Sequence, residues 1–100
     1  MIATVWRFRV RAEHVAAFER VYGPAGDWAK LFAKAPGYAG TKLLKQDGEP
    51  GTYLTLDLWR DDTAFVASKE LLQGDYAALD RRCEAYTCEE TWLGLYRIVD

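Results

Sequence analysis

The sequence predicts an α+β fold whose elements follow one another in the order βαββαβ. Three observations predict it: segments that alternate as strands do, helical periodicity after two of them, and turn-forming residues at the boundaries. The stretch 53–65 combines all three, because a strand of period two leads directly into a charged turn and then a helix. The chain of 100 residues is expected to form one domain, residues 1–100.

The N-terminal third predicts one strand and two helical pieces. The strand spans Ile2–Val10, and a helix with apolar residues at helical spacing begins near Glu13. Gly23 and Pro24 end this helix, because proline cannot continue the backbone hydrogen-bond ladder. A second helical piece begins at about Asp27, which is the predicted N-cap.

The middle of the chain predicts a β-hairpin. One strand runs from Tyr38 to Gln46, a loop rich in turn formers covers Asp47–Gly51, and the next strand is Thr52–Trp59. This last strand alternates strictly, and neither of its faces is plainly a water-facing one. One face carries Leu54, Leu56 and Leu58, and the other carries Tyr53, Thr55, Asp57 and Trp59.

The C-terminal part predicts a helix in two pieces and a fourth strand. Asp62 or Thr63 is expected to cap the first piece, and Gly74-Asp75 to interrupt the helix. The strand covers about Glu89–Val99 and carries two alternative apolar sets, either Trp92, Tyr96 and Ile98 or Leu93, Leu95 and Val99. The complete order is that of a ferredoxin-like fold, an antiparallel four-stranded sheet with helices on one face.

An antiparallel sheet covered by helices on one face leaves its second face open. Apolar residues of the third and fourth predicted strands would then lie on that open face. Because an exposed apolar sheet face favours association, and pairing across a two-fold axis buries it, we expect a homodimer.

Composition excludes several classes of protein. The formal net charge of −2 does not favour a nucleic-acid binder, which would carry a basic excess. Two cysteines, Cys83 and Cys88, and the single histidine do not make a metal site, and the cysteines are expected to be free thiols. The N-terminus has no apolar signal-like run and no stretch reaches membrane-spanning length, so we expect a cytoplasmic protein without a membrane partner.

Three short segments carry a resemblance to a known family: Val10–Phe18, Ala35–Tyr38, and Asp57–Trp59 with Ala64 and Phe65 after it. Taken in this order and spacing, they resemble the antibiotic biosynthesis monooxygenase family of the dimeric α+β barrel superfamily. The resemblance covers essentially the whole chain and implies a small dimer with a hydrophobic cavity between sheet and helices. Members of the family include cofactor-independent oxygenases of polyketide anthrones or quinols, and enzymes that degrade haem.

The sequence departs from the haem-degrading relatives. Trp59 matches their tryptophan, but the chain contains no asparagine, and the segment Gly74–Tyr86 contains no histidine to bind haem iron. The matching region ends in Asp80, and aspartate is a poor axial ligand, so haem is not expected and no cofactor is expected. The anthrone-oxidising relatives also place an asparagine four residues before the tryptophan, where this chain has Thr55, whose hydroxyl can still donate a hydrogen bond.

The candidate catalytic residues are Trp59, Asp57 and Thr55, which share one strand face. The Trp59 indole N–H can donate to a carbonyl or phenolate oxygen in a dry pocket, although a tryptophan here also suits a packing role alone. A carboxylate at Asp57 in an apolar pocket can act as a general base. Its alternative role is a salt bridge to Arg7 or Arg9 on a neighbouring strand.

Aromatic residues predict a flat, apolar, small-molecule ligand. The expected substrate contacts are Trp6, Phe8, Trp28, Phe32, Tyr38 and Tyr76. His14, at the start of the first helix, is expected to pack, and the acidic pair Glu89-Glu90 is expected to be solvated.

Three functions compete at this stage. The first is a monooxygenase that oxidises an electron-rich aromatic or quinol with O2, which needs no metal, flavin or nucleotide motif. The second is a small-molecule-binding or stress-associated dimer without turnover. The third is RNA binding, with Trp6, Phe8 and Tyr53 as stacking residues on the sheet, which the acidic composition does not favour.

Overall fold

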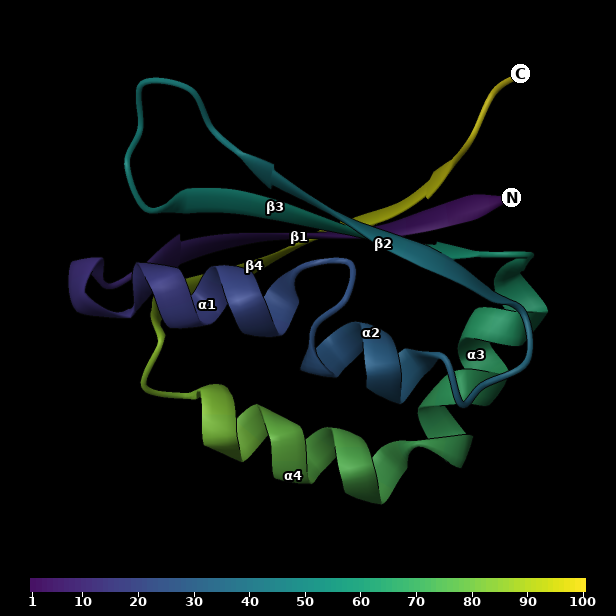
Figure 1. Cartoon of the computed structure of the whole chain (residues 1–100). Coiled ribbons are helices and arrows are strands. Elements are labelled where there is room, and N and C mark those ends of the chain that lie inside the picture. Colours follow the sequence, from purple (N-terminus) through teal and green to yellow (C-terminus); the bar gives the residue numbers. More distant parts are fainter.

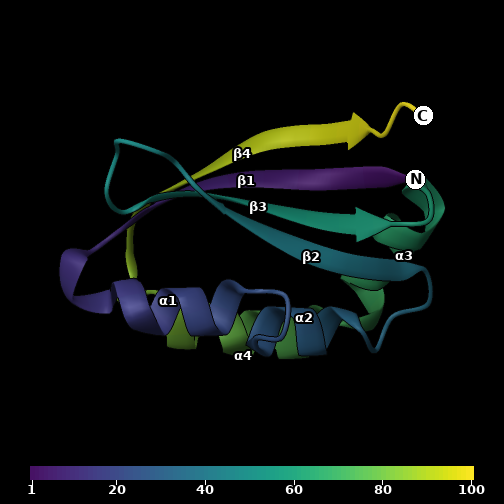
Figure 2. The ribbon, with the colours of Figure 1, turned by 45° about the horizontal axis from the view of Figure 1, so that its top comes forward.

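A computed structural model describes residues 1–100 and shows two layers, a four-stranded sheet and a layer of helices (Figure 1). The sheet is antiparallel with the order β2-β3-β1-β4, and all helices lie on one of its faces (Figure 2). This confirms the ferredoxin-like α+β fold. The elements are β1 Ile2–Val10, the short 3-10 helix η1 Ala12–His14, α1 Val15–Tyr22, α2 Asp27–Phe32, β2 Tyr38–Lys45, β3 Thr52–Trp59, α3 Asp62–Leu71, α4 Gln73–Cys83 and β4 Thr87–Arg97.

The strand register decides which side chains face the helices. β1 pairs with β3 from Ile2 opposite Trp59 to Arg9 opposite Thr52, and directly opposite residues share a face. Phe8 and Tyr53 are therefore on the same side, and both pack against Phe18 of α1. The whole alternating set of β3 that includes Asp57 and Trp59 consequently points towards the helices.

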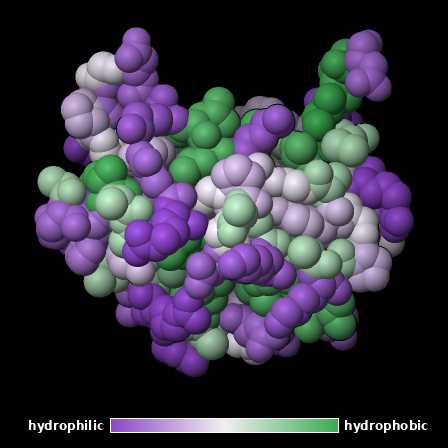
Figure 3. Space-filling model, viewed as in Figure 1, coloured by the Kyte–Doolittle hydropathy of each residue, from purple (hydrophilic) through white to green (hydrophobic).

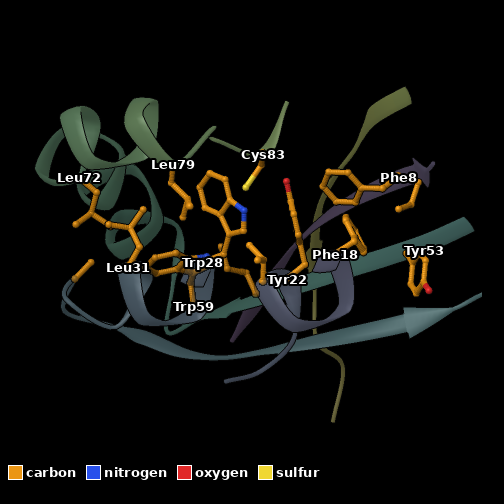
Figure 4. Packing of buried hydrophobic residues seen from close by; sticks show 14 residues of the cluster. Phe8, Phe18, Tyr22, Trp28, Leu31, Tyr53, Trp59, Leu72, Leu79 and Cys83 are labelled. Atoms are coloured by element: carbon orange, nitrogen blue, oxygen red, sulfur yellow. The ribbon is translucent and has the colours of Figure 1, made fainter. Parts of the chain in front are cut away.

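The core is built largely from aromatic rings between the two layers. Phe18 is fully buried, and its ring stacks on Tyr22 with centroids 4.1 Å apart. Figure 4 shows this pair beside Trp28 and the Cys83 sulfur, between the sheet and α4. Burying such large side chains supplies much of the stabilisation available to a domain of this size.

Helix boundaries differ from the sequence-based expectations by one to two residues. The side chain of Asp61, not Asp62 or Thr63, caps α3, with its Oδ1 accepting from the Ala64 N–H at 2.8 Å. Asp27 is the first helical residue of α2 rather than its cap, and its carboxylate accepts from Arg82 of α4. The break between α3 and α4 lies at Leu72. It is not at Gly74-Asp75, as expected, since both of these residues lie inside α4.

A β-bulge in β4 makes both predicted apolar sets wrong. Trp92 pairs with Trp6, but the next pair joins Gly94 to Val5, so one residue is left over between them. Gly94 adopts a φ of +132°, a conformation that side chains other than glycine's rarely reach. After the bulge the alternation is shifted, so Leu95 shares the helix-covered face with Trp92, while Tyr96 lies on the open face.

No helix covers the second face of the sheet (Figures 1 and 2). Figure 3 shows apolar surface at the top of the view, between the raised β2–β3 loop and the C-terminal tail. The open face carries Leu54, Leu56 and Leu58 of β3, all half-buried, with Leu44 and Tyr96 more exposed. None of the helices combines the length and the apolar character needed to cross a membrane.

Candidate functional site

Two adjoining cavities lie between the sheet and the helices. The larger has a volume of about 500 Å³, and the smaller about 150 Å³. They share the side chains of Trp6, Phe32, Asp57 and Tyr76, so they form two lobes of one site. Together they have the size and mostly apolar lining of a small-molecule site.

Asp57 stands at the junction of the two lobes and is the most buried carboxylate of the site. It points inward from β3 and is only 9% exposed. Its Oδ1 accepts a hydrogen bond of 2.7 Å from Thr41 of the neighbouring strand, directly opposite in register. Because Thr41 has one hydroxyl hydrogen, the 2.5 Å contact between Thr41 and Tyr38 must be donated by the Tyr38 phenol. The two linked hydrogen bonds hold Oδ1 of Asp57 and leave its Oδ2 without a hydrogen-bond partner.

Burial raises the pKa of Asp57 to about 6, and the hydrogen bond from Thr41 opposes this rise only in part. The expected salt bridge to Arg7 or Arg9 is wrong, because those residues pair opposite Leu54 and Thr52 on the other sheet face. Asp57 therefore has no counter-ion, and its affinity for a proton suits a general base near neutral pH.

Trp59 forms a wall of the larger lobe. It is the last residue of β3, and its ring is edge-on to Phe32 and Tyr38 and tilted against Phe65, with centroids 5.4–5.9 Å apart. At 1% exposure it is almost completely buried. Its indole N–H is buried without a hydrogen-bond partner, which is uncommon for a buried polar group.

Most of the other predicted contacts also meet in these lobes. Thr55 lines the smaller lobe together with five of the six predicted aromatic contacts, namely Trp6, Phe8, Trp28, Phe32 and Tyr76. Tyr38 lines neither lobe and instead supports Thr41 and Trp59 from behind. The indole N–H of Trp28 also lacks a partner and lies beside the Cys83 sulfur (Figure 4).

Two acidic residues of the site were not predicted. Glu90 is exposed to solvent, as expected, but it pairs opposite Phe8 and so shares the helix-covered face, where it lines the smaller lobe with Asp80 of α4. Burial and then the neighbouring Asp80 raise the pKa of Glu90. Only the register of β4 could have revealed this, because Glu89 next to it is on the opposite face. Thr41 was missed for the same reason, since its role depends on its pairing with Asp57.

The proposed RNA-stacking surface does not exist in the form expected. Phe8 and Tyr53 are buried under the helices, and Trp6 lines the cavity, so none presents a ring on an open sheet face. His14 is half-buried beside Tyr86 with ring centroids 5.5 Å apart, which agrees with a packing role.

The lining of the two lobes lacks the side chains that most often bind haem iron. Neither lobe contains a histidine, cysteine or methionine side chain. His14 lies on η1, outside both lobes.

The chain matches a known family over most of its length. The model of the antibiotic biosynthesis monooxygenase family matches residues 1–71, which include β1 to α3 and thus Thr55, Asp57 and Trp59. No curated protein sequence matches the chain.

Several solved structures share the fold. SnoaB, a cofactor-independent oxygenase from Streptomyces nogalater, is 25% identical with a TM-score of 0.68, covering 99% of this chain and 93% of SnoaB. A NIPSNAP domain protein from Burkholderia xenovorans is 16% identical with a TM-score of 0.73, covering 99% and 95% of the two chains. A mutant of MhuD with two manganese protoporphyrin IX bound per active site is 21% identical with a TM-score of 0.71, covering 100% and 96%. The last two similarities support the fold alone.

Proposed function

Because the chain belongs to the antibiotic biosynthesis monooxygenase family, we propose that it is a cofactor-independent monooxygenase of a small electron-rich aromatic or quinol substrate. One observation carries the proposal: Asp57, with one carboxylate oxygen free of hydrogen bonds, and Trp59, whose indole N–H has no partner, line the same cavity. The first can take a proton and the second can stabilise an oxyanion. The similarity to SnoaB, described as a cofactor-independent oxygenase, supports the same reaction class.

The proposed reaction begins with proton transfer. Asp57 removes a proton from an acidic methylene or phenol of the bound ring, and the Trp59 N–H donates to the oxygen that becomes negative. The resulting carbanion or phenolate is electron-rich enough to reduce O2 itself. One oxygen atom replaces two hydrogen atoms of a ring methylene as a carbonyl, and the other leaves as water, so atoms and electrons balance without a further reductant.

The remaining residues position the substrate. Thr55 offers a hydroxyl to the smaller lobe, and the rings of Trp6, Phe32 and Tyr76 enclose a flat molecule on several sides. A bound ring would displace water from these lobes, and water would otherwise weaken the hydrogen bond to the developing charge. In this proposal the protein contributes orientation, a base and a donor, and no cofactor.

Oxygen uptake tests this function. We expect protein-dependent uptake with a panel of anthrones and quinols, after autoxidation is subtracted. Trp59→Phe keeps a large ring in the core but removes the N–H, and should lower the rate about 10- to 100-fold, as expected for loss of one donor to the developing charge. Trp92→Phe removes the indole N–H of a half-exposed tryptophan in the same lining, and it should lower the rate less than Trp59→Phe does. A rate that is the same in wild type and Trp59→Phe would contradict the role of the indole.

The competing function is a small-molecule-binding dimer without turnover. The absence of asparagine from the chain favours it, because the anthrone-oxidising relatives are expected to use one. Uptake no faster than the protein-free blank across the panel, together with a ligand recovered from the purified protein, would support this alternative.

We also propose that two copies of the chain associate through the open sheet face. Leu54, Leu56 and Leu58 lie in a central strand, and a two-fold axis would place the same apolar row of a second copy against them. Sedimentation should give twice the 11.4 kDa of one chain. Leu56→Lys should shift the mass towards the monomer, while Val66→Lys on the exposed side of α3 should not. A monomeric wild type at micromolar concentration would contradict this assembly.

A further inference from the structure

The smaller lobe has an unusual combination of side chains. Aromatic rings form most of its wall, and every charged side chain in its lining is acidic. The acids come from three elements that are far apart in the sequence: Asp57 from β3, Asp80 from α4 and Glu90 from β4. No lysine, arginine or histidine lines this lobe.

The acids act on one another and on the same ring. The pKa of Tyr76 is raised to about 12, first by burial and then by the charges of Asp80, Glu90 and Asp57. None of the three carboxylates takes part in the salt bridges of the chain. The negative charge of this lobe is therefore not compensated within the protein.

Buried polar groups without partners point independently to a ligand. Asp57 is nine-tenths buried and lines both lobes, and only one of its two carboxylate oxygens accepts a hydrogen bond within the protein. The N–H of Trp59 is fully buried and equally unpaired in the adjoining lobe. Such groups cost stability unless something arrives to satisfy them. A ligand with a hydrogen-bond donor or a cation near Asp57 and an oxygen acceptor near Trp59 would supply partners for both residues.

We propose that the substrate is an aromatic ammonium compound, whose cationic nitrogen lies between Asp80 and Glu90 in the smaller lobe while its oxygen-bearing ring reaches Trp59. Asp80 and Glu90 are exposed to solvent, so their attraction for the ammonium group is modest, and the ring faces of the lobe add cation–π attraction. The three acids are not arranged to hold a metal ion together, and the aromatic wall of the lobe suits an organic ammonium group. This inference rests on the proposed function for the ring, but the recognition of the cation is separable from turnover.

Binding of three probes of one shape tests the inference. These are 2-phenylethylammonium, 2-phenylethanol and 3-phenylpropanoate, which differ in charge and which the proposed reaction does not oxidise. By calorimetric titration, we expect the cation to bind about tenfold more tightly than the alcohol, and the anion to bind least tightly. Equal affinity for cation and alcohol would overturn the inference, as would a failure to detect cation binding at about 10 mM.

A double variant assigns the effect to the two acids. Asp80→Asn with Glu90→Gln should bring the affinities for cation and alcohol within about twofold of each other. Its affinity for the alcohol should stay unchanged, which would show that the lobe is still folded. The matched control, Asp75→Asn with Glu89→Gln, removes the same net charge from α4 and β4 outside the lining and should keep the preference. A preference that survives in the first double variant would overturn the inference.

The two proposals fail in different ways. Turnover of neutral quinols without any preference for the ammonium probe would refute the cation site and leave the oxygenase standing. A clear preference for the ammonium probe without oxygen uptake would refute the oxygenase and leave a binding protein for aromatic amines.

Discussion

Asp57→Asn is expected to abolish oxygen uptake and, in the same protein, to increase the stability of the fold. Asparagine keeps an oxygen that can accept the hydrogen bond from Thr41 but cannot take a proton from the substrate. Loss of a general base lowers the rate by about 10²- to 10⁴-fold. The wild-type rate should rise as the pH increases through about 6, where the Asp57 carboxyl ionises.

The stability effect has the opposite sign because the pKa of Asp57 is raised from 3.8 to about 6 on folding. The folded state holds this proton more tightly than the unfolded state does. Its contribution is complete below about pH 4 and is lost as the pH rises through 6. At pH 8 the buried charge therefore costs about 2–3 kcal/mol, which the asparagine variant does not incur.

Thermal unfolding at a fixed protein concentration measures this difference. The advantage of Asp57→Asn over wild type should be largest at pH 8 and should shrink towards pH 4. Asp47→Asn, in the exposed hairpin loop, serves as the control and should show no such trend. If Asp57→Asn were less stable than wild type at pH 8, the carboxylate would be a stabilising structural group, and its role as an uncompensated base would be refuted.

Phe18→Ala is expected to cause the largest loss of stability. The side chain is fully buried, and its ring lies within 4.1–5.5 Å of the ring centroids of Tyr22, Tyr53 and Phe8. Truncation removes apolar burial and leaves a cavity, which together cost about 3–5 kcal/mol. That is a large part of the stability of an ordinary domain of this size.

Urea denaturation would measure the loss at one protein concentration, so that any dimerisation affects both proteins alike. Val66→Ala, at a position 63% exposed on α3, should change the free energy of unfolding by about 0.5 kcal/mol or less. A loss below about 1 kcal/mol for Phe18→Ala would show that the core closes around the gap and that the ring cluster does not hold α1 to the sheet.

The fold follows from the sequence where one residue pattern dominates. β1 and β3 have the predicted bounds. Each segment alternates strictly and is bounded by turn-forming residues, so its sequence fixes both where the strand ends and which residues share a face. The pattern in β4 fails at the bulge, because one extra residue, Leu93, reverses the faces of everything that follows. A bulge depends on how the strand pairs, and pairing is a property of the fold that no local pattern contains.

The same distinction explains the site. Asp57, Thr55 and Trp59 could be grouped in advance because they alternate along a single strand. The support of Asp57 by Thr41, and the approach of Asp80 and Glu90, depend on contacts between separate elements. The sequence also allowed a salt bridge from Asp57 to an arginine, because β1 carries Arg7 and Arg9. Only the strand register shows that both arginines lie on the opposite face of the sheet.

The proposed oxygenase would insert one oxygen atom from O2 into an aromatic molecule bound in this cavity. Mass spectrometry of the product formed under ¹⁸O2, quenched before exchange with water, would detect that atom. We expect one labelled oxygen atom in each product molecule made by the wild-type protein, and no protein-dependent product with Asp57→Asn. Product that carries only unlabelled oxygen, or that forms equally fast with Asp57→Asn, would contradict the proposal.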